Sequence, residues 1–386
     1  MRKFYTAEAV TEGHPDKLCD QIADAILDVC LKNDENSRVA CEVLATKGNI
    51  IVAGEITSAY EPDVFAVVRK VLSDIGYSSE GIAMDTFVHQ QSSDIAGAVD
   101  TSKERREGVS DNQMDWFQGA GDQGVMIGYA CDETKQLMPM PVVLANRIIR
   151  ELSACRQSSY IQGILSDGKA QVTVEYENGR PVRLDSVVVS CQHTEDKNLK
   201  KLEAEIRKKV LLPALRLLPP DEDTKIFINP SGRFVCGGMD ADTGLTGRKL
   251  MVDSYGSMVP HGGGAFSGKD CSKVDRSAAY MARYIAKNIV AAGLASKCQV
   301  SLAYAIGVAQ PVMVQVDTFG TGKVCADDCL ELAIPLVFGL TPKQIVDSLR
   351  LTRPIFRQTA AFGHFGRKEF PWERTDKVED LRNAVI

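Results

Sequence analysis

The segment best suited to chemistry is a glycine-rich loop that ends in a lysine, HGGGAFSGKD at residues 261–270. Glycines let a backbone approach a ligand closely, so bare amide N–H groups and one ammonium group can hold a phosphate. Gly263 to Lys269 satisfies most of the Walker A pattern, but Asp270 stands where a Ser or Thr should coordinate magnesium. The next helix is expected to begin only near Ser272, too late for a P-loop. A mobile glycine linker is the alternative interpretation.

A second candidate is Gly13-His14-Pro15-Asp16-Lys17, which is expected to open a helix. Proline suits the first helical position, and the free amides of that end attract anions. His14 would then stand beside an anion site. The alternative is an ordinary helix start, in which the negative charge of Asp16 interacts favourably with the helix dipole and His14 lies on the surface.

Three further segments combine glycine with charge. Gly119–Gly124 (GAGDQG) precedes the apolar run Val125–Tyr129, so its glycines either admit a ligand beside Asp122 or form a simple turn into a strand. Ser231–Phe234 and Asp242–Lys249 also combine glycine with charged residues. Arg248 and Lys249 either bind a ligand or form a solvated pair at a strand edge. Because no Ser–His–Asp signature or HExxH pair is present, any catalysis is expected to rely on charge placement and metal ions.

Composition narrows the function classes. The chain has 386 residues, 44% of them hydrophobic and 25% charged, which suggests two or three globular domains. No apolar run approaches the ~18 residues of a membrane span, and no signal segment is evident, so we expect a cytoplasmic protein without a membrane partner. The net charge of −6 argues against nucleic acid. Eleven scattered cysteines without a zinc pattern indicate buried, reduced thiols.

The residue patterns predict an α+β fold with helices on one face of mostly antiparallel sheets. Helices are expected at 16–31, 199–210 and 273–292, the last with a capping-box-like start at Ser272 and Asp275. Strands are expected at 38–43, 50–56, 171–176, 184–190, 226–228 and 300–304. We predict three similar subdomains, at 1–100, 114–235 and 236–386, with a mobile loop at 101–113.

Taken together, these motifs closely resemble the S-adenosylmethionine synthetase (methionine adenosyltransferase) family. The similarity extends from Thr6 to Glu373 and is carried by EGHPDK at 12–17, GAGDQG at 119–124, GGGAFSGKD at 262–270 and AAFGHFGR at 360–367. The resemblance implies transfer of the adenosyl group of ATP to the sulfur of L-methionine, followed by hydrolysis of the bound triphosphate to pyrophosphate and phosphate. It also implies two magnesium ions per site, potassium, and a homodimer with shared active sites, either alone or paired into a homotetramer.

The resemblance assigns roles residue by residue. ATP would be bound by His14, Asp167, Lys169, Arg233, Phe234, Asp242, Arg248, Lys249, Ala265 and Lys269. The catalytic residues among these would be His14, Lys169, Arg248, Lys249 and Lys269. Methionine would be held by Glu55, Gln91, Asp122, Asp242 and Lys273. Asp16 and Asp275 would bind magnesium, and Glu42 would bind potassium. The polar stretch at 92–113, which follows Gln91, would be a lid with that residue at its hinge; a disordered linker is the alternative.

The sequence departs from the family pattern in three places, and two other functions compete with this one. Gly163–Asp167 reads GILSD where the family usually has Leu-Arg-Pro-Asp, Met239 replaces a proline, and Ala7-Glu8-Ala9 replaces Ser-Glu-Ser. None of these changes removes a charged group used above. A P-loop kinase or NTPase would form ADP, but Asp270 argues against it. A non-catalytic ATP-binding paralogue would form no product, but the intact charged residues argue against that.

Overall fold

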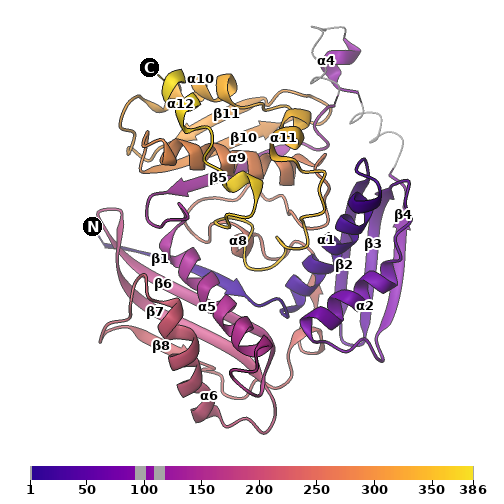
Figure 1. Cartoon of the computed structure of the whole chain (residues 1–386), viewed down its shortest axis with the longest axis vertical. Coiled ribbons are helices and arrows are strands. Elements are labelled where there is room, and N and C mark those ends of the chain that lie inside the picture. The colour runs from indigo at the N-terminus through magenta and orange to yellow at the C-terminus, as the bar shows by residue number, and fades with distance from the viewer. Residues whose placement is uncertain (1, 92–100, 108–117, 386) are drawn as a thin grey trace.

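The computed structural model describes residues 2–91, 101–107 and 118–385, which form three β-sheets covered by helices (Figure 1). Most neighbouring strands are antiparallel, and the parallel pairs in the described residues are β3 with β4 and β7 with β8. The expected α+β fold is therefore confirmed.

The first sheet has the strand order β1-β6-β7-β8. Its strands are β1 (Arg2–Val10), β6 (Ile164–Glu177), β7 (Arg180–His193) and β8 (Lys225–Ile228). Helix α5 (Met140–Gln157) packs on β1 and β6, and its buried face is apolar. Helix α6 (Leu199–Ile206) continues through a π-helical turn, Arg207–Leu211, into α7 (Leu212–Ala214), and α5 packs against these last two segments.

The second sheet has the order β4-β3-β2-β9. Its strands are β4 (Ala83–His89), β3 (Asn49–Thr57), β2 (Arg38–Thr46) and β9 (Gly244–Leu245). Helix α1 (Pro15–Asn33) packs on β2 and β9, and α2 (Val64–Ile75) packs on α1. The sheet therefore carries the GHPDK helix on one face.

The third sheet has the order β11-β10-β5, with strands β11 (Met313–Asp317), β10 (Lys297–Tyr304) and β5 (Gly124–Cys131). The long buried helix α9 (Val274–Ala291) packs on β5 and β10. The remaining helices are α4 (Lys103–Arg106), α8 (Leu250–Asp253), α10 (Asp327–Val337), α11 (Pro342–Leu349) and α12 (Val378–Ala384), with 3-10 turns at Gly238–Asp240 and Pro371–Glu373.

Each sheet takes one strand from a distant part of the sequence. Strand β1 joins strands that follow residue 160, β5 joins strands that follow residue 290, and β9 joins strands that precede residue 90. These exchanges tie the three layers together, and Figure 1 shows β1 crossing from the N-terminus into the sheet of β6 to β8. The subdomain boundaries predicted from the sequence stay a prediction, and the sheets do not follow them strand for strand.

The expected helices and strands all exist, and the strands extend beyond the predicted ends because pairing continues into polar residues. One detail was wrong: α9 is capped by Lys273, which makes no side-chain capping bond, and Ser272 is not its N-cap. The interpretation of 92–113 as a lid falls largely outside the described residues. In its described part, the Lys103 amide donates to the Gly307 carbonyl (2.8 Å) and the Glu104 carboxylate accepts from the Ala309 amide (3.0 Å).

The cysteines and helices bear on two other expectations. All eleven cysteines are free thiols, as expected, but Cys236 and Cys329 are exposed and so depart from the predicted burial. Among the helices of the described residues, none alone is long and apolar enough to cross a membrane. Helices α10 and α11 meet that test of length and composition only as a pair, with a 76° bend between them.

Candidate functional site

The first part of the site is the N-terminus of α1. Pro15 occupies the first turn, and the His14 side chain caps the helix, with Nδ1 accepting from the Asp16 amide at 3.2 Å. Gly13 is required here because a Cβ at this position would lie 2.4 Å from the Ser166 carbonyl oxygen. The helix start is therefore pressed against β6. The His14 side chain is only 14% exposed, which contradicts a surface position.

His14 is a neutral hydrogen-bond donor. Burial lowers its pKa to about 4, and the charges of Lys249 and Lys169 act in the same direction while Asp16 opposes them. Because Nδ1 accepts a hydrogen bond from a backbone amide, the ring proton belongs on Nε2. At neutral pH this residue therefore offers an N–H group, and the cationic charge of the site comes from its neighbours.

Asp16 binds strand β9 and the residues that follow it. Its carboxylate accepts from the Leu245 amide at 3.0 Å, forms an ion pair with Lys249, and lies 3.7 Å from an Arg248 nitrogen. Burial acts to raise the pKa of Asp16, but the bonds from Lys249 and Leu245 lower it overall. Close approach of the two segments depends on Gly244, where a Cβ would lie 2.2 Å from the Pro15 carbonyl oxygen.

Three further predicted residues border this group. The Asp167 carboxylate accepts from the Gly238 amide at 2.7 Å, and burial, followed by the nearby charge of Asp242, raises its pKa. Asp242 also acts electrostatically on His14. Lys169 pairs with Glu8 at 2.9 Å, although both side chains are substantially exposed. The fold thus brings together seven predicted residues: His14, Asp16, Asp167, Lys169, Asp242, Arg248 and Lys249.

The glycine-rich loop at 262–270 forms the second part of the site. Lys269 pairs with Asp275 in the first turn of α9, and a Cβ on Gly264 would lie 2.2 Å from a carboxylate oxygen of Asp275. The loop reaches the first group where a Cβ on Gly247 would lie 2.7 Å from the Cβ of Ala265. It follows helix α8 and precedes α9, so the Walker-type strand–loop–helix arrangement is absent from this part of the described chain.

The two glycine motifs meet at the N-terminus of α9. A Cβ on Gly121 would lie 2.7 Å from the Ser272 carbonyl oxygen, and a Cβ on Gly262 would lie 1.6 Å from the Val125 carbonyl oxygen. Asp122 is exposed, and its carboxylate accepts from the Gln123 amide at 2.7 Å. The GAGDQG segment therefore does precede a strand, as predicted, and it also packs against the phosphate-loop candidate.

Lys273 has a partner that sequence reasoning overlooked. Its ammonium group pairs with Asp270, whose carboxylate also accepts from the amides of Val39 (2.6 Å) and Ser272 (2.8 Å). The sequence shows Asp270 only as a departure from the Walker pattern. Asp270 binds the loop to β2. The sequence signal that could have indicated this role is a carboxylate directly after a glycine–lysine pair.

The residues predicted to hold methionine are spread over several elements: Glu55 lies on β3, Gln91 follows β4, Asp122 precedes β5, Asp242 precedes β9, and Lys273 caps α9. Glu55 on β3 lies opposite Ala40 on β2, which bridges Lys269 in turn, so these positions occupy adjacent backbone segments. The Glu55 carboxylate lies 3.2 Å from His89 Nε2. The Gln91 side-chain oxygen is buried without a hydrogen-bond partner among the described residues.

Other predicted residues stand apart from the lysines. Arg233 pairs with Glu195 at 2.7 Å on the exposed surface, and the Phe234 amide donates to His193 Nε2 at 3.0 Å. Among the described residues, neither Arg233 nor Phe234 forms a hydrogen bond or ion pair with Lys249 or Lys269. Glu42 projects from β2 as an exposed carboxylate. Nowhere in residues 2–91, 101–107 and 118–385 do three or more His, Cys, Asp or Glu side chains gather as a metal site.

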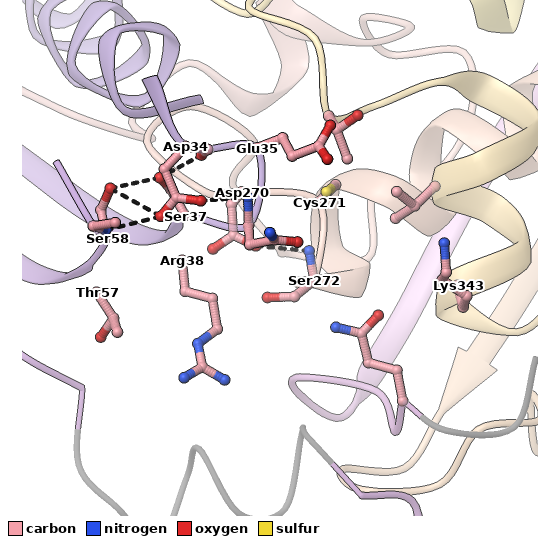
Figure 2. A pocket seen from close by; sticks show the side chains of 15 residues that line it. Asp34, Glu35, Ser37, Arg38, Thr57, Ser58, Asp270, Cys271, Ser272 and Lys343 are labelled. Carbon is pink, nitrogen blue, oxygen red and sulfur yellow. Dashed lines mark hydrogen bonds between the residues drawn. The ribbon is translucent and has the colours of Figure 1, made fainter. Parts of the chain in front are cut away.

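A pocket of about 680 Å³ opens beside the start of α9 (Figure 2). Its walls include Arg38 and Thr57 of the second sheet, Asp270 at the end of the loop, Ser272 just before α9, and Lys343 of α11. Figure 2 shows Asp270 bonded to Ser272 beside the Arg38 side chain. Through Asp270 and Ser272 the pocket lies next to Lys269 and Lys273. Its described lining contains none of the residues predicted to bind ATP, so the pocket is separate from those residues.

Lysines, glycine loops and a neutral histidine donor, gathered at the N-termini of α1 and α9, form an arrangement suited to a polyphosphate. Three family models match the chain: the S-adenosylmethionine synthetase N-terminal domain at residues 2–103, the central domain at 117–234 and the C-terminal domain at 236–374. The chain belongs to the S-adenosylmethionine synthetase family. It is a methionine adenosyltransferase, an enzyme that forms S-adenosylmethionine from methionine and ATP, and the family uses metal ions.

Proposed function

We propose that this chain forms S-adenosylmethionine in one displacement at the 5′ carbon of ATP and then hydrolyses the triphosphate. The methionine sulfur forms a bond to C5′ with its lone pair, and the C5′–O bond breaks with its electrons leaving on triphosphate. Water then cleaves bound triphosphate into pyrophosphate and phosphate. The observation that carries the proposal is the convergence of Lys249, Arg248 and His14 on the N-terminus of α1.

A thioether needs no general base, because it has no proton to lose during the attack. His14 is suited to a different task, since its neutral ring can donate a hydrogen bond from Nε2 to a phosphate oxygen. The barrier lies in expelling a highly charged leaving group, whose charge preorganised donors and cations can stabilise. The predicted catalytic residues His14, Lys169, Arg248, Lys249 and Lys269 would supply those groups.

We propose magnesium and potassium as the metal ions. Magnesium usually binds through one or two carboxylates together with substrate phosphates and water. Asp16 and Asp275 fit this pattern, because each presents one carboxylate, buried in Asp16 and partly buried in Asp275, beside a lysine that could turn to phosphate. Magnesium would neutralise charge on the triphosphate. Glu42 offers one exposed carboxylate, so potassium binding there rests on the family resemblance alone.

The remaining ligand assignments are proposed from the resemblance. Methionine would lie among Glu55, Gln91, Asp122, Asp242 and Lys273, and the adenosine of ATP would lie near Asp167, Arg233, Phe234 and Ala265. The buried oxygen of Gln91, which has no partner in the described chain, supports a ligand at that point.

We propose a homodimer with shared active sites that assembles into a homotetramer, in the cytoplasm. Large apolar side chains are exposed on strands of all three sheets: Phe4, Val182 and Phe227 in the first, Phe87 in the second and Val125 in the third. Exposed apolar surface of this kind favours association with a second copy. A monodisperse monomer with full activity at assay concentration would rule out shared sites.

The test is to incubate the purified chain with ATP, methionine, magnesium and potassium and to identify products by mass spectrometry. We expect S-adenosylmethionine with equal amounts of pyrophosphate and phosphate, and little product when either metal ion is omitted. Formation of ADP would support a kinase instead. Release of intact triphosphate would refute the hydrolytic step while leaving the transfer step standing.

A further inference from the structure

Helix α1 carries four aspartates at every fourth position, and each accepts backbone amides from a segment far along the chain. Asp16 accepts from Leu245 at 3.0 Å and Asp20 from Gly247 at 2.9 Å. Asp24 accepts from Gly268 at 2.8 Å, and Asp28 accepts from Phe356 and Arg357 at 2.8 and 2.9 Å. Residues four apart share one helix face, so the four carboxylates form a single row.

Asp20 fixes one end of the segment that bears Arg248 and Lys249. Its buried carboxylate binds the Gly247 amide and pairs with the buried ammonium group of Lys17 at 2.9 Å. Lys17 pairs with Asp253 as well, at the end of α8. The Lys17–Asp20 pair therefore anchors both ends of the segment 247–253.

Asp24 fixes the backbone on both sides of Lys269. Its carboxylate accepts from the Gly268 amide and from two nitrogens of buried Arg276, at 2.6 and 2.8 Å. Arg276 in turn donates to the Lys269 carbonyl oxygen at 3.1 Å. The backbone on both sides of the Lys269 side chain is thus bound to one buried ion pair.

The two amides belong to glycines with left-handed backbone conformations, Gly247 at φ +79° and Gly268 at φ +80°. A glycine has no side chain to pack, so hydrogen bonds to its amide are the direct means of fixing it. Buried charge-assisted hydrogen bonds are short and strong, and a helix is a rigid support. Asp20 and Asp24 are thus placed one helical turn apart, each beside a different lysine segment.

We propose that Asp20 and Asp24 are positioning residues: Asp20 holds the Arg248–Lys249 segment, and Asp24 holds the Lys269 segment, in the conformation that binds phosphate. This inference rests on the proposed role of those lysines in binding phosphate. Neither aspartate would touch the substrate, because both carboxylates are fully buried and already bonded. Asp28 provides a matched control: it lies in the same row and binds backbone amides, but its partners adjoin no proposed site residue.

The experiment uses inorganic tripolyphosphate with magnesium as the probe and the full chain in calorimetric titrations. We expect Asp20→Asn and Asp24→Asn each to weaken tripolyphosphate binding about tenfold, the scale of one hydrogen bond to a charged group. Asp28→Asn should change the affinity less than about twofold, because its loop carries no phosphate ligand. Thermal unfolding of each variant shows whether it is folded. If an Asn variant is not, Asp20→Glu or Asp24→Glu keeps the charge but displaces the acceptor, and should also weaken binding.

Two results would overturn the proposal. One is a folded Asp20 or Asp24 variant that binds tripolyphosphate as tightly as the unmodified chain. The other is an equal loss in Asp28→Asn, which would mean that general loosening of α1 causes the effect. Lys249→Met and Lys269→Met separate this inference from the proposed function. If these lysine variants keep full affinity, the proposed phosphate site is wrong; if only they lose affinity, the positioning role alone is wrong.

Discussion

Lys249 forms an ion pair with Asp16, although 233 positions separate them in the sequence. The pair balances the lysine charge and keeps the pKa of Asp16 below its usual value. A bound triphosphate would compete with Asp16 for Lys249, and the released carboxylate would be free to bind a metal ion. Such an exchange would couple phosphate binding to metal binding.

The first prediction concerns that exchange. In Asp16→Asn, Lys249 has no charged competitor at this position, so tripolyphosphate should bind about tenfold more tightly in the absence of magnesium. Turnover with magnesium should nevertheless fall, because a carboxylate ligand is lost. Titrations with and without magnesium measure the first effect, and initial rates measure the second. Unchanged magnesium-free affinity would show that Asp16 does not restrain Lys249.

The second prediction concerns Lys269. Lys269→Met should lower kcat by two to three decades, about 3 kcal/mol, with a smaller change in the KM for methionine, since a preorganised cation acts mainly on the charged transition state. The matched control is Lys70→Met on α2, whose side chain is 69% exposed and pairs with Asp74 on the same helix. That variant should retain full activity. Loss of substrate affinity with intact turnover would mean uniform binding by Lys269.

A third prediction follows from the neutral state of His14. His14→Ser keeps a helix-capping oxygen but removes the Nε2–H donor, so α1 should remain stable while turnover falls by about two decades. The thermal midpoint and kcat are measured on the same preparation. A fall in the midpoint that accounts for the lost activity would assign His14 a structural role only.

The fourth prediction is a pH dependence of stability from Asp253. Burial raises the pKa of this carboxyl group to about 7, and it pairs with Lys17 and lies 3.8 Å from His364 Nε2. Between about pH 4 and pH 7 the folded state therefore binds more protons here than the unfolded state, so this group's contribution to stability falls as pH rises. Asp253→Asn lacks that dependence. Its stability relative to the unmodified chain should improve from pH 5 to pH 8 in urea titrations, and a constant difference would contradict the prediction.

Local sequence was enough to predict three helices, six strands and the chemical character of the motifs, whereas α2, α5, α10, α11, α12, β1, β4, β9 and β11 were not predicted. The apolar spacing of α9 and the alternation along β2 and β3 specify their structures because each depends on neighbours within a few positions. Pro15 and Asp16 likewise mark a helix start wherever that helix packs. The family resemblance was confirmed along nearly the whole chain.

Only the tertiary structure decided which charges meet and in what state. The neutral form of His14 depends on burial and on Lys249, which arrives from a distant segment, and the partners of Asp20 and Asp24 are backbone amides that no residue pattern identifies. The exchange of β1, β5 and β9 between sheets also depends on long-range pairing. Sequence determines propensities that act over one or two turns of the chain. Burial and ion pairing depend on distances in space, and these distances are set only when the three sheets and their helices pack together.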